Sequence, residues 1–241
     1  RGNILRAVSH DLRTPLTSVK GYIKGMRDGV ANTPEKQERY LDIAYRKSCD
    51  MERLLQRLLY FSRLETGNLP MFPVEDDLGA FAGRFAREAG EELAASGGQV
   101  NFHPAEEPLP VRIDQEQLLR VLNNLKENAQ RYAGAEPLIL DISVKREGER
   151  ACLRFADNGQ GVPEDQLPHL FQQFWRGDQA RRSQGGEGSG LGLYIVKYVV
   201  EAHGGTVTAE NDGGLAFTIS LPLRTESEEK EDNGHEQDID R

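Results

Sequence analysis

The sequence predicts an α+β protein in which a long two-helix antiparallel hairpin precedes a mixed α/β domain. The first observation behind this prediction is a seven-residue apolar repeat through two segments before residue 67, which is typical of long amphipathic helices. The second is a series of short apolar runs after residue 74 that alternate with amphipathic stretches. The turn-rich segment GNLPMFPVED separates the two halves.

Two helices make up the predicted hairpin. Residues 3–30 carry two rows of side chains at helical spacing, with one polar gap at Ser9; the apolar members are Leu5, Leu12, Leu16, Val19, Ile23, Met26 and Val30. A second helix is expected over 36–66, because Thr33 is a suitable N-cap and Gly67 a suitable C-cap. Two helices bury only one stripe, so we expect two copies to pair as a dimeric four-helix bundle.

Shorter patterns predict the rest of the chain. Amphipathic spacing indicates helices over 76–96, 114–132, 165–174 and 191–203, and apolar runs indicate strands over 71–74, 99–103, 138–146, 151–157, 205–211 and 214–223. The expected parts are therefore a hairpin over 1–66, a linker and hinge over 67–73, an α/β domain over 74–223, and a disordered tail over 224–241 that is rich in Asp and Glu.

Composition limits the function classes. The 241 residues carry a net charge of −9, which argues against a nucleic-acid partner. The two cysteines are far apart and form no metal-binding spacing, which favours a reduced, intracellular compartment. No apolar run approaches the roughly 20 residues that span a bilayer. Because the chain begins at Arg1 and is periodic at once, we expect a piece of a longer protein, with any membrane anchor in a missing N-terminal part.

The segment NNLKENAQRY, residues 123–132, lies on a predicted helix. Asn124 and Asn128 are four residues apart and therefore share one face. Amide oxygens are hard ligands that Mg²⁺ accepts beside waters and phosphate oxygens. Arg131 is placed to reach a phosphate and Tyr132 to lie against a base. Taken alone, two asparagines on a helix are also compatible with an ordinary surface.

Two glycine-containing segments follow. DNGQGVP, residues 157–163, puts Asp157 at a strand end before a loop that can approach a ligand closely, although such turns are common. GGEGSGLGL, residues 185–193, leads directly into an apolar helix, and free N–H groups at a helix start favour anions. The stretch 176–189 before the helix has the composition of a mobile lid, with a surface loop as the alternative. Neither a Rossmann nor a Walker pattern is present.

The segment SHDLRTPLT, residues 9–17, holds a histidine on the first predicted helix. At 100° per residue, His10, Asp11 and Thr14 point away from the apolar seam by about 120° or more. The histidine is therefore an exposed one, either simply solvated or available to react. Pro15 lacks an N–H and is expected to bend the helix just past His10.

In order and spacing, these segments resemble the cytoplasmic core of a bacterial sensor histidine kinase of a two-component system. SHDLRTPLT is similar to the H box, NNLKENAQRY to the N box, DNGQGVP to the G1 box, LFQQFWRGD to the F box and GSGLGL to the G2 box. The resemblance covers residues 3–223. It implies a dimerisation and histidine-phosphotransfer hairpin, followed by an ATP-binding α/β sandwich of the Bergerat type with a mixed sheet and helices on one face.

The resemblance also implies the roles of individual residues. Asn128 would hold Mg²⁺ with help from Asn124, Arg131 would contact phosphate, Tyr132 would pack on adenine, and Asp157 would accept a hydrogen bond from the adenine amino group. Other residues of the implied ATP site would shape the pocket, anchor the lid or close over the phosphates: Gly159, Gly161, Phe171, Phe174, Arg176, Gly188, Gly190, Leu191, Gly192 and Leu193.

For the hairpin, the resemblance implies that His10 is the phospho-acceptor and that Asp11 orients the imidazole and helps to remove its proton. The phosphoryl group would pass to an aspartate in the receiver domain of a response regulator. Asp11 followed by Thr14 matches the pattern of kinases that also dephosphorylate their partner, with Thr14 orienting a water. The chain would then be the cytoplasmic domain of a cell-membrane protein that acts as a homodimer.

One position departs from the family pattern, and two alternatives stay open. Lys126 stands where the N box usually has an apolar residue, and it either extends its amine to solvent or perturbs packing or nucleotide binding. A hydrolysing ATPase of the gyrase and mismatch-repair group would need Glu where this chain has Asn124, and would lack the hairpin with His10. The other alternative is a non-enzymatic scaffold that binds ATP weakly and relays signals by a change of shape. Lys126 is the only feature of the sequence that supports this alternative.

Overall fold

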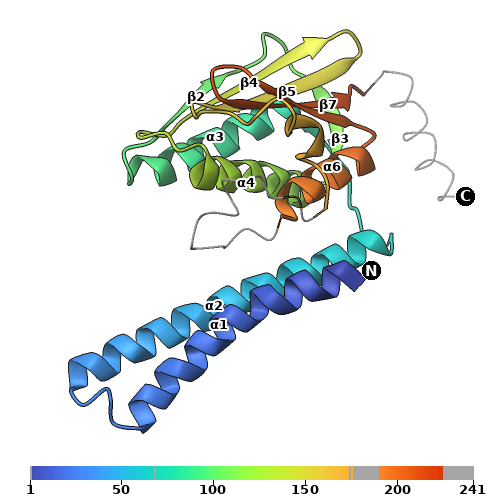
Figure 1. Ribbon diagram of the computed structural model, residues 1–241. Helices are drawn as coiled ribbons and strands as arrows, with labels where there is room; N and C mark the ends of the chain where they lie inside the picture. Colours follow the sequence, from blue (N-terminus) through green and yellow to red (C-terminus); the bar gives the residue numbers. More distant parts are fainter. Residues whose placement is uncertain (1, 68, 174, 176–189, 225–241) are drawn as a thin grey trace, which may run out of the picture. The chain divides into compact units, whose positions relative to one another are not determined.

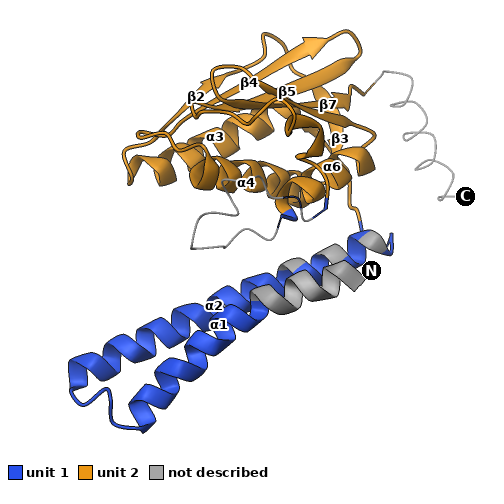
Figure 2. Ribbon diagram, viewed as in Figure 1, with its two compact units in different colours: residues 1–70, 173–191 blue, residues 71–172, 192–241 orange. Residues whose placement is uncertain are grey.

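The computed structural model describes residues 2–67, 69–173, 175 and 190–224, which form two compact units (Figure 1). The first unit comprises residues 1–70 and 173–191, and the second comprises residues 71–172 and 192–241 (Figure 2). The predicted tail at 224–241 lies outside the described residues except for Arg224, as does most of the predicted lid. None of the described helices combines the length and the apolar character that a bilayer span requires.

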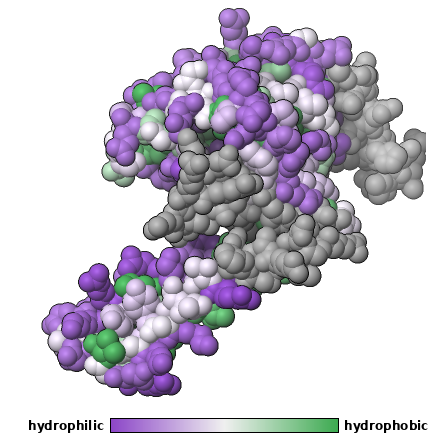
Figure 3. Space-filling model, in the orientation of Figure 1, coloured by the Kyte–Doolittle hydropathy of each residue, from purple (hydrophilic) through white to green (hydrophobic). Residues whose placement is uncertain are grey.

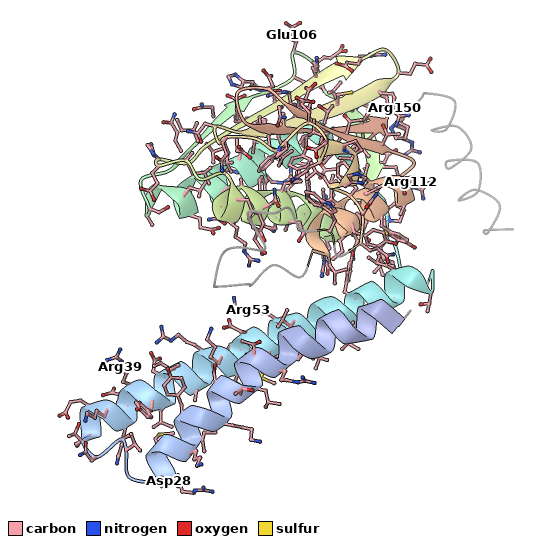
Figure 4. All side chains as sticks on the ribbon, viewed as in Figure 1. Asp28, Arg39, Arg53, Glu106, Arg112 and Arg150 are labelled. Atoms are coloured by element: carbon pink, nitrogen blue, oxygen red, sulfur yellow. The ribbon has the colours of Figure 1, made fainter. Side chains whose placement is uncertain are left out.

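The hairpin is confirmed. Helix α1 (Gly2–Arg27) packs along helix α2 (Pro34–Glu65). The Thr33 side chain accepts a hydrogen bond from the Lys36 amide, so the predicted N-cap is correct. Gly67 follows α2 in the left-handed conformation and its N–H donates to the Leu64 carbonyl, as expected for a helix C-terminus. Arg39 and Arg53 lie on the exposed surface of α2, where Arg53 pairs with Asp50 (Figure 4).

The first helix is shorter than the predicted 3–30. It ends at Arg27 because Gly29 adopts a positive φ of 76° and the Val30 amide turns back to the Gly25 carbonyl. A glycine adopts this backbone conformation without steric cost, so it ends the helix where an apolar repeat alone predicts continuation.

The second unit is a mixed five-stranded sheet with three helices on one face, as predicted (Figure 1). The strands lie in the order β2 (Gln99–His103), β4 (Ile139–Glu147), β5 (Arg150–Asp157), β7 (Leu215–Pro222) and β6 (Thr206–Asn211). Only the β2–β4 pair is parallel. The covering helices are α3 (Leu78–Ala94), α4 (Gln115–Tyr132) and α6 (Gly192–Ala202).

The core of this unit lies between the helices and the sheet. Phe155 of β5 and Phe217 of β7 stand opposite each other in register, and both are buried. Phe85 of α3 reaches the Phe155 ring at a centroid separation of 6.4 Å. On α4, the apolar face is buried completely through Leu118, Val121, Leu122 and Leu125. The polar side chains between these positions are therefore turned away from the sheet.

Two predicted elements are wrong in detail. The strand expected over 71–74 is instead β1 (Val74–Asp77), because it pairs antiparallel with β3 (Pro110–Ile113), a strand that the sequence pattern did not indicate. The helix expected over 165–174 is only a 3₁₀ turn, Leu167–His169, within the described residues. Pro168 explains the second difference, because it lacks the N–H that a longer helix would need at that position.

Candidate functional site

One face of α4 presents the two predicted asparagines. Asn124 and Asn128 are half-buried, and neither side-chain amide makes a hydrogen bond within the described part of the chain. Gly192 begins α6 beside them, since a Cβ built on it would stand 3.5 Å from the Asn124 side-chain oxygen. The structure therefore places the last glycine of the segment GSGLGL beside the helix that carries both asparagines.

The end of α4 carries the next two predicted residues. The guanidinium of Arg131 lies 3.7 Å from the Glu127 carboxylate one turn earlier. Tyr132 is the last residue of the helix, and its side chain is 38% exposed. An aromatic ring exposed to this extent beside half-buried amides can serve as a stacking surface.

Asp157 lies at the end of β5, as predicted, and is buried. Its Oδ1 accepts hydrogen bonds from the amides of Gly159, at 2.8 Å, and Leu215, at 3.2 Å. Burial raises the pKa of this carboxyl, while the two backbone hydrogen bonds act in the opposite direction. Oδ2 accepts no hydrogen bond from any residue that the structure describes, so it remains available to a donor on a ligand.

The loop after Asp157 packs on the end of α4. The Gln160 amide donates to the Ala133 carbonyl at 3.2 Å. A Cβ on Gly159 would stand 2.4 Å from that same carbonyl oxygen, so only glycine allows the close approach. This contact joins the Asp157 loop to the helix that ends in Tyr132. The contact therefore holds the Asp157 loop next to the C-terminal end of the helix that also carries Asn124 and Asn128.

The sequence prediction missed Asn211, which holds the same loop from the other side. Its Oδ1 accepts from the Val162 amide at 3.0 Å, and its Nδ2 donates to the Val162 carbonyl at 2.7 Å and to Glu164 at 3.3 Å. Gly161 has a φ of 68°, and a Cβ on it would collide with this amide. An asparagine before DGG is an ordinary turn signal, so no local pattern assigns Asn211 to the loop at 157–163.

The remaining predicted residues of this site are only partly described. The ring of Phe171 contacts Phe217 edge to face, with centroids 6.1 Å apart. Gly190 adopts a φ of 65°, Leu191 is buried and Leu193 is half-buried at the start of α6. Phe174, Arg176 and Gly188 lie outside the described residues.

The hairpin residues form a separate group. His10 and Asp11 lie in α1, and their side chains are outside the described part of the structure. Thr14 is exposed on the same helix, one position before Pro15. Beyond the proline, the hydroxyls of Thr17 and Ser18 donate to the carbonyls of Arg13 and Thr14. Such bonds accompany bent helices.

Lys126 points away from the predicted nucleotide-binding asparagines. It is 160–200° from Asn124 and Asn128 around the helix, by rotation of about 100° per residue. Its amine contacts the Glu92 carboxylate on α3, and this hydrogen bond lowers the pKa of Glu92. The Lys126 side chain is only 10% exposed, and its amine ends at an ion pair between two helices rather than in solvent.

The donor set fits a magnesium ion that is held mainly by a nucleotide. The described residues contain no cluster of three or more His, Cys, Asp or Glu side chains that could hold a metal by themselves. Mg²⁺ commonly uses only one or two protein ligands together with waters and phosphate oxygens. The unbonded amide oxygens of Asn124 and Asn128 match that chemistry.

Comparison with known proteins agrees with this arrangement. Residues 1–67 match the His Kinase A (phospho-acceptor) domain, and residues 113–225 match the histidine kinase-, DNA gyrase B- and HSP90-like ATPase domain. The sensor protein VanS of Enterococcus faecium is 31% identical over 223 residues, which are 92% of this chain and 57% of VanS. The chain thus spans little more than half of that relative's length.

Solved structures show the same fold. The histidine kinase AdeS of Acinetobacter baumannii is 26% identical, with a TM-score of 0.69 over 90% of this chain and 98% of that one. The histidine kinase ThkA, solved in complex with the response regulator TrrA, has a TM-score of 0.71 at 21% identity, over 92% of this chain and 62% of that one. With both domains matched in order, the chain belongs to the sensor histidine kinases.

Proposed function

We propose that this chain transfers the γ-phosphoryl group of ATP to His10 and then to an aspartate of a response-regulator receiver domain. The observation that supports the nucleotide part is that α4 brings three features together: Asn124 beside Gly192 at the start of α6, Asn128 one turn later, and the Asp157 loop packed on the end of the helix. Within the described residues, neither asparagine amide makes a hydrogen bond and Oδ2 of Asp157 accepts none. The ATPase domain match over 113–225 and the phospho-acceptor match over 1–67 support the two halves of the reaction.

Most of the named residues of the α/β unit bind the nucleotide. The Asp157 carboxylate accepts from the adenine amino group, Tyr132 packs on the base, and Arg131 contacts phosphate. Gly159 keeps the adenine loop close to the end of α4, and Gly161 keeps it close to Asn211. Asn128 and Asn124 would hold Mg²⁺, which neutralises phosphate charge when bound. Phe171 anchors the base of the lid through its contact with Phe217. The lid and the start of α6 close over the phosphates through the remaining residues of the site: Arg176, Gly188, Gly190, Leu191, Gly192 and Leu193.

The transfer steps balance without a further reactant. A neutral imidazole, with an ordinary pKa of about 6.5, attacks the γ-phosphorus through a ring nitrogen. The bond to the bridging oxygen breaks and ADP leaves with the electron pair, while Asp11 stabilises the imidazolium and assists loss of its proton. In the second step, a receiver carboxylate attacks the phosphorus and the P–N bond breaks with its electron pair left on the ring nitrogen. The ring takes up again the proton that it lost in the first step, so His10 leaves as a neutral imidazole.

The domain division and the assembly follow the same proposal. Residues 1–66 form the dimerisation and phosphotransfer hairpin, 67–73 the hinge, 74–223 the ATP-binding domain and 224–241 an acidic tail. Two hairpins pair as a four-helix bundle, which the exposed apolar face of α1 and α2 supports. Since the reaction consumes ATP, we place this core on the cytoplasmic side of a membrane-bound sensor.

Radiolabelled ATP tests the phosphotransfer proposal. With millimolar Mg-ATP labelled at the γ position, the wild-type chain should acquire an acid-labile, alkali-stable label. His10→Gln should lose that label, whereas His103→Gln, which changes an exposed histidine on β2, should keep it. Absence of label on the wild type, or its persistence in His10→Gln, would show that the proposal is wrong.

A reverse activity is proposed for Thr14. This residue is exposed on α1 one turn beyond His10, where its hydroxyl can orient a water for attack on a phospho-aspartate. Thr14→Ala should retain autophosphorylation but lose dephosphorylation of the phosphorylated regulator. Serine at the same position retains a hydroxyl and should restore the activity. Equal loss of both activities in Thr14→Ala would contradict a separate role.

A further inference from the structure

Asp114 joins three segments of the α/β unit that are distant in the sequence. Its Oδ1 accepts from the Gln117 amide at 3.0 Å, which caps the N-terminus of α4. Its Oδ2 accepts from the Phe72 amide at 2.8 Å. Its own backbone N–H donates to Nε2 of His203 at 2.9 Å. The residue is only 4% exposed, so these bonds are shielded from water.

His203 is fixed in one neutral tautomer by its two contacts. Nδ1 lies 2.7 Å from the Val199 carbonyl, which can only accept, so Nδ1 carries the proton. Nε2 is then the acceptor that the Asp114 amide requires. Because His203 directly follows α6, the ring fastens the C-terminal end of α6 to the N-terminal end of α4.

These two helices carry most of the proposed phosphate-side groups. They pack against each other (Figure 1), with Gly192 at the start of α6 beside Asn124 in the middle of α4. The pair therefore runs antiparallel, with the Asp114–His203 contact at one end of α6 and the nucleotide-facing residues at the other. The 11 residues of α6 span about 16 Å between these ends.

The third partner of Asp114 belongs to the proposed hinge. Phe72 is the second residue of the α/β unit, and its side chain is 74% exposed while its amide is held by the carboxylate. The side chain thus contributes little to fixing the segment, and the backbone hydrogen bond is what ties the hinge to α4. A displacement of the Phe72 backbone would therefore act first on the Asp114 carboxylate, which caps α4, and not on the apolar core.

We propose that Asp114 and His203 are positioning residues that couple the backbone of Phe72 to the spacing of α4 and α6. Nucleotide binding between the helices then strengthens the Phe72–Asp114 bond, and by reciprocity that bond strengthens nucleotide binding. The inference rests on the proposed nucleotide site and adds to it a route by which the hinge senses nucleotide.

The chain offers a matched pair of aspartates for a test. Asp114→Asn keeps one side-chain oxygen and can still cap α4, but it cannot also accept from Phe72. Asp77 has the same two-sided arrangement, since Oδ1 accepts from Ala80 at the start of α3 and Oδ2 accepts from Leu109. Asp77→Asn therefore removes an equivalent bond on a helix that carries none of the proposed nucleotide-binding residues.

Amide hydrogen exchange measures the coupling directly. Pro70 and Pro73 lack amide protons, so the exchangeable amides between them are those of Met71 and Phe72. In the 241-residue chain, saturating Mg-ADP should slow exchange of the Phe72 amide by about fivefold or more. Asp114→Asn should reduce this effect below about twofold and weaken ADP binding, whereas Asp77→Asn should leave both close to wild type.

A second variant keeps the test decisive if Asp114→Asn fails to fold. His203→Ala should also reduce the effect of Mg-ADP on the Phe72 amide, and His203→Gln, whose side-chain oxygen can accept from Asp114, should restore part of it. If Mg-ADP binds the wild type by calorimetry without slowing exchange at Phe72, or if Asp114→Asn retains the effect, the coupling is wrong. If the wild type binds no Mg-ADP, the proposed nucleotide site itself fails, and the coupling fails with it.

Discussion

The hairpin and the α/β unit differ in what they do with large apolar side chains. Among the hairpin side chains that the structure describes, seven remain substantially exposed: Leu16, Ile23, Val30, Leu41, Tyr45, Leu55 and Leu59. Figure 3 shows such apolar patches among hydrophilic residues on the hairpin. In the α/β unit, the side chains between helices and sheet are fully buried, as at Leu118, Leu122, Leu140 and Ile142.

This difference shows which part of the protein encloses its apolar core within a single copy of the chain. Three helices and a five-stranded sheet enclose a core, whereas two helices can cover only the stripe between them. An exposed apolar face of this extent marks an interaction surface, which we assign to a second hairpin. Changes in the hairpin should therefore act on assembly, and changes in the α/β unit on nucleotide binding.

The largest effect is expected from Ile23→Asp, which places a charge on the exposed apolar face of the hairpin and should weaken the dimer. Ile23 is 52% exposed in one copy, so burying the rest of it contributes about half of the 1.5–3 kcal/mol expected for full burial. Because a twofold dimer contains two copies of each contact, loss of this burial alone should raise the dissociation constant by about 10- to 200-fold, and the charge of the introduced aspartate adds to the effect. Sedimentation velocity over a concentration series measures this change.

Val74→Asp is the matched control for Ile23→Asp. Val74 is an apolar residue of similar exposure, 49%, but it lies on β1 of the α/β unit. This variant should sediment like the wild type. A dimer that survives Ile23→Asp, or one that dissociates equally in both variants, would mean that the hairpin face is not the dimer interface.

The next largest effect is expected from Asp157→Asn, in the α/β unit. Replacing an ionised acceptor of the adenine amino group should weaken ADP binding by about 10- to 100-fold, since a hydrogen bond to a charged group contributes about 1.5–3 kcal/mol. Fluorescent-nucleotide titration measures the affinity, and the variant should remain dimeric. Because burial already raises the pKa of Asp157, the neutral amide should leave the melting temperature unchanged or higher.

The same carboxyl predicts a pH dependence of nucleotide affinity. A bound amino donor favours the ionised form, so affinity is full above the pKa of the free site and falls as pH drops through it. Since that pKa is raised, the loss should begin at higher pH than for an ordinary Asp, whose pKa is about 3.9. Stability has the opposite dependence: the raised pKa favours the folded state below the unfolded value and this contribution disappears as pH rises. Asp157→Asn should lack the affinity change.

Asn211→Ala should have a smaller effect on ADP binding, and it tests whether the position of the loop after β5 matters for that binding. It removes both hydrogen bonds to Val162 and the one to Glu164, so ADP binding should weaken by about 3- to 10-fold, in line with one net hydrogen bond. Asn101→Ala, which removes a hydrogen bond between side chains on β2, should keep wild-type affinity. Equal affinity in the two variants would contradict a positioning role for Asn211.

The smallest effect is expected from Lys126→Leu, which restores the apolar residue usual at this position. The amine of Lys126 pairs with Glu92 on α3, and the Glu92 side chain is largely exposed, so the ion pair contributes about 0–1 kcal/mol. ADP affinity should change by less than about twofold, and chemical denaturation should show a small shift in either direction. A tenfold loss of affinity would show that Lys126 supports the nucleotide site after all.

Local pattern was sufficient for the long helices, apart from the end of the first one, for most strands and for the order of the motifs. The hairpin caps at Thr33 and Gly67, the shared face of Asn124 and Asn128, and the strand-end position of Asp157 depend on neighbours within a few residues, and all four were predicted correctly. These features follow from periodicity and capping chemistry, which a single sequence displays.

Tertiary structure alone decided the contacts between distant segments. Asn211 meets Val162 across 49 residues, Asp114 meets His203 across 89, and Lys126 meets Glu92 across 34. The pairing of β1 with β3, which moved the first strand to 74–77, is of the same kind. Each of these contacts depends on how the sheet and its helices bring remote backbone groups together, and no local pattern of apolar or polar residues encodes that partner choice.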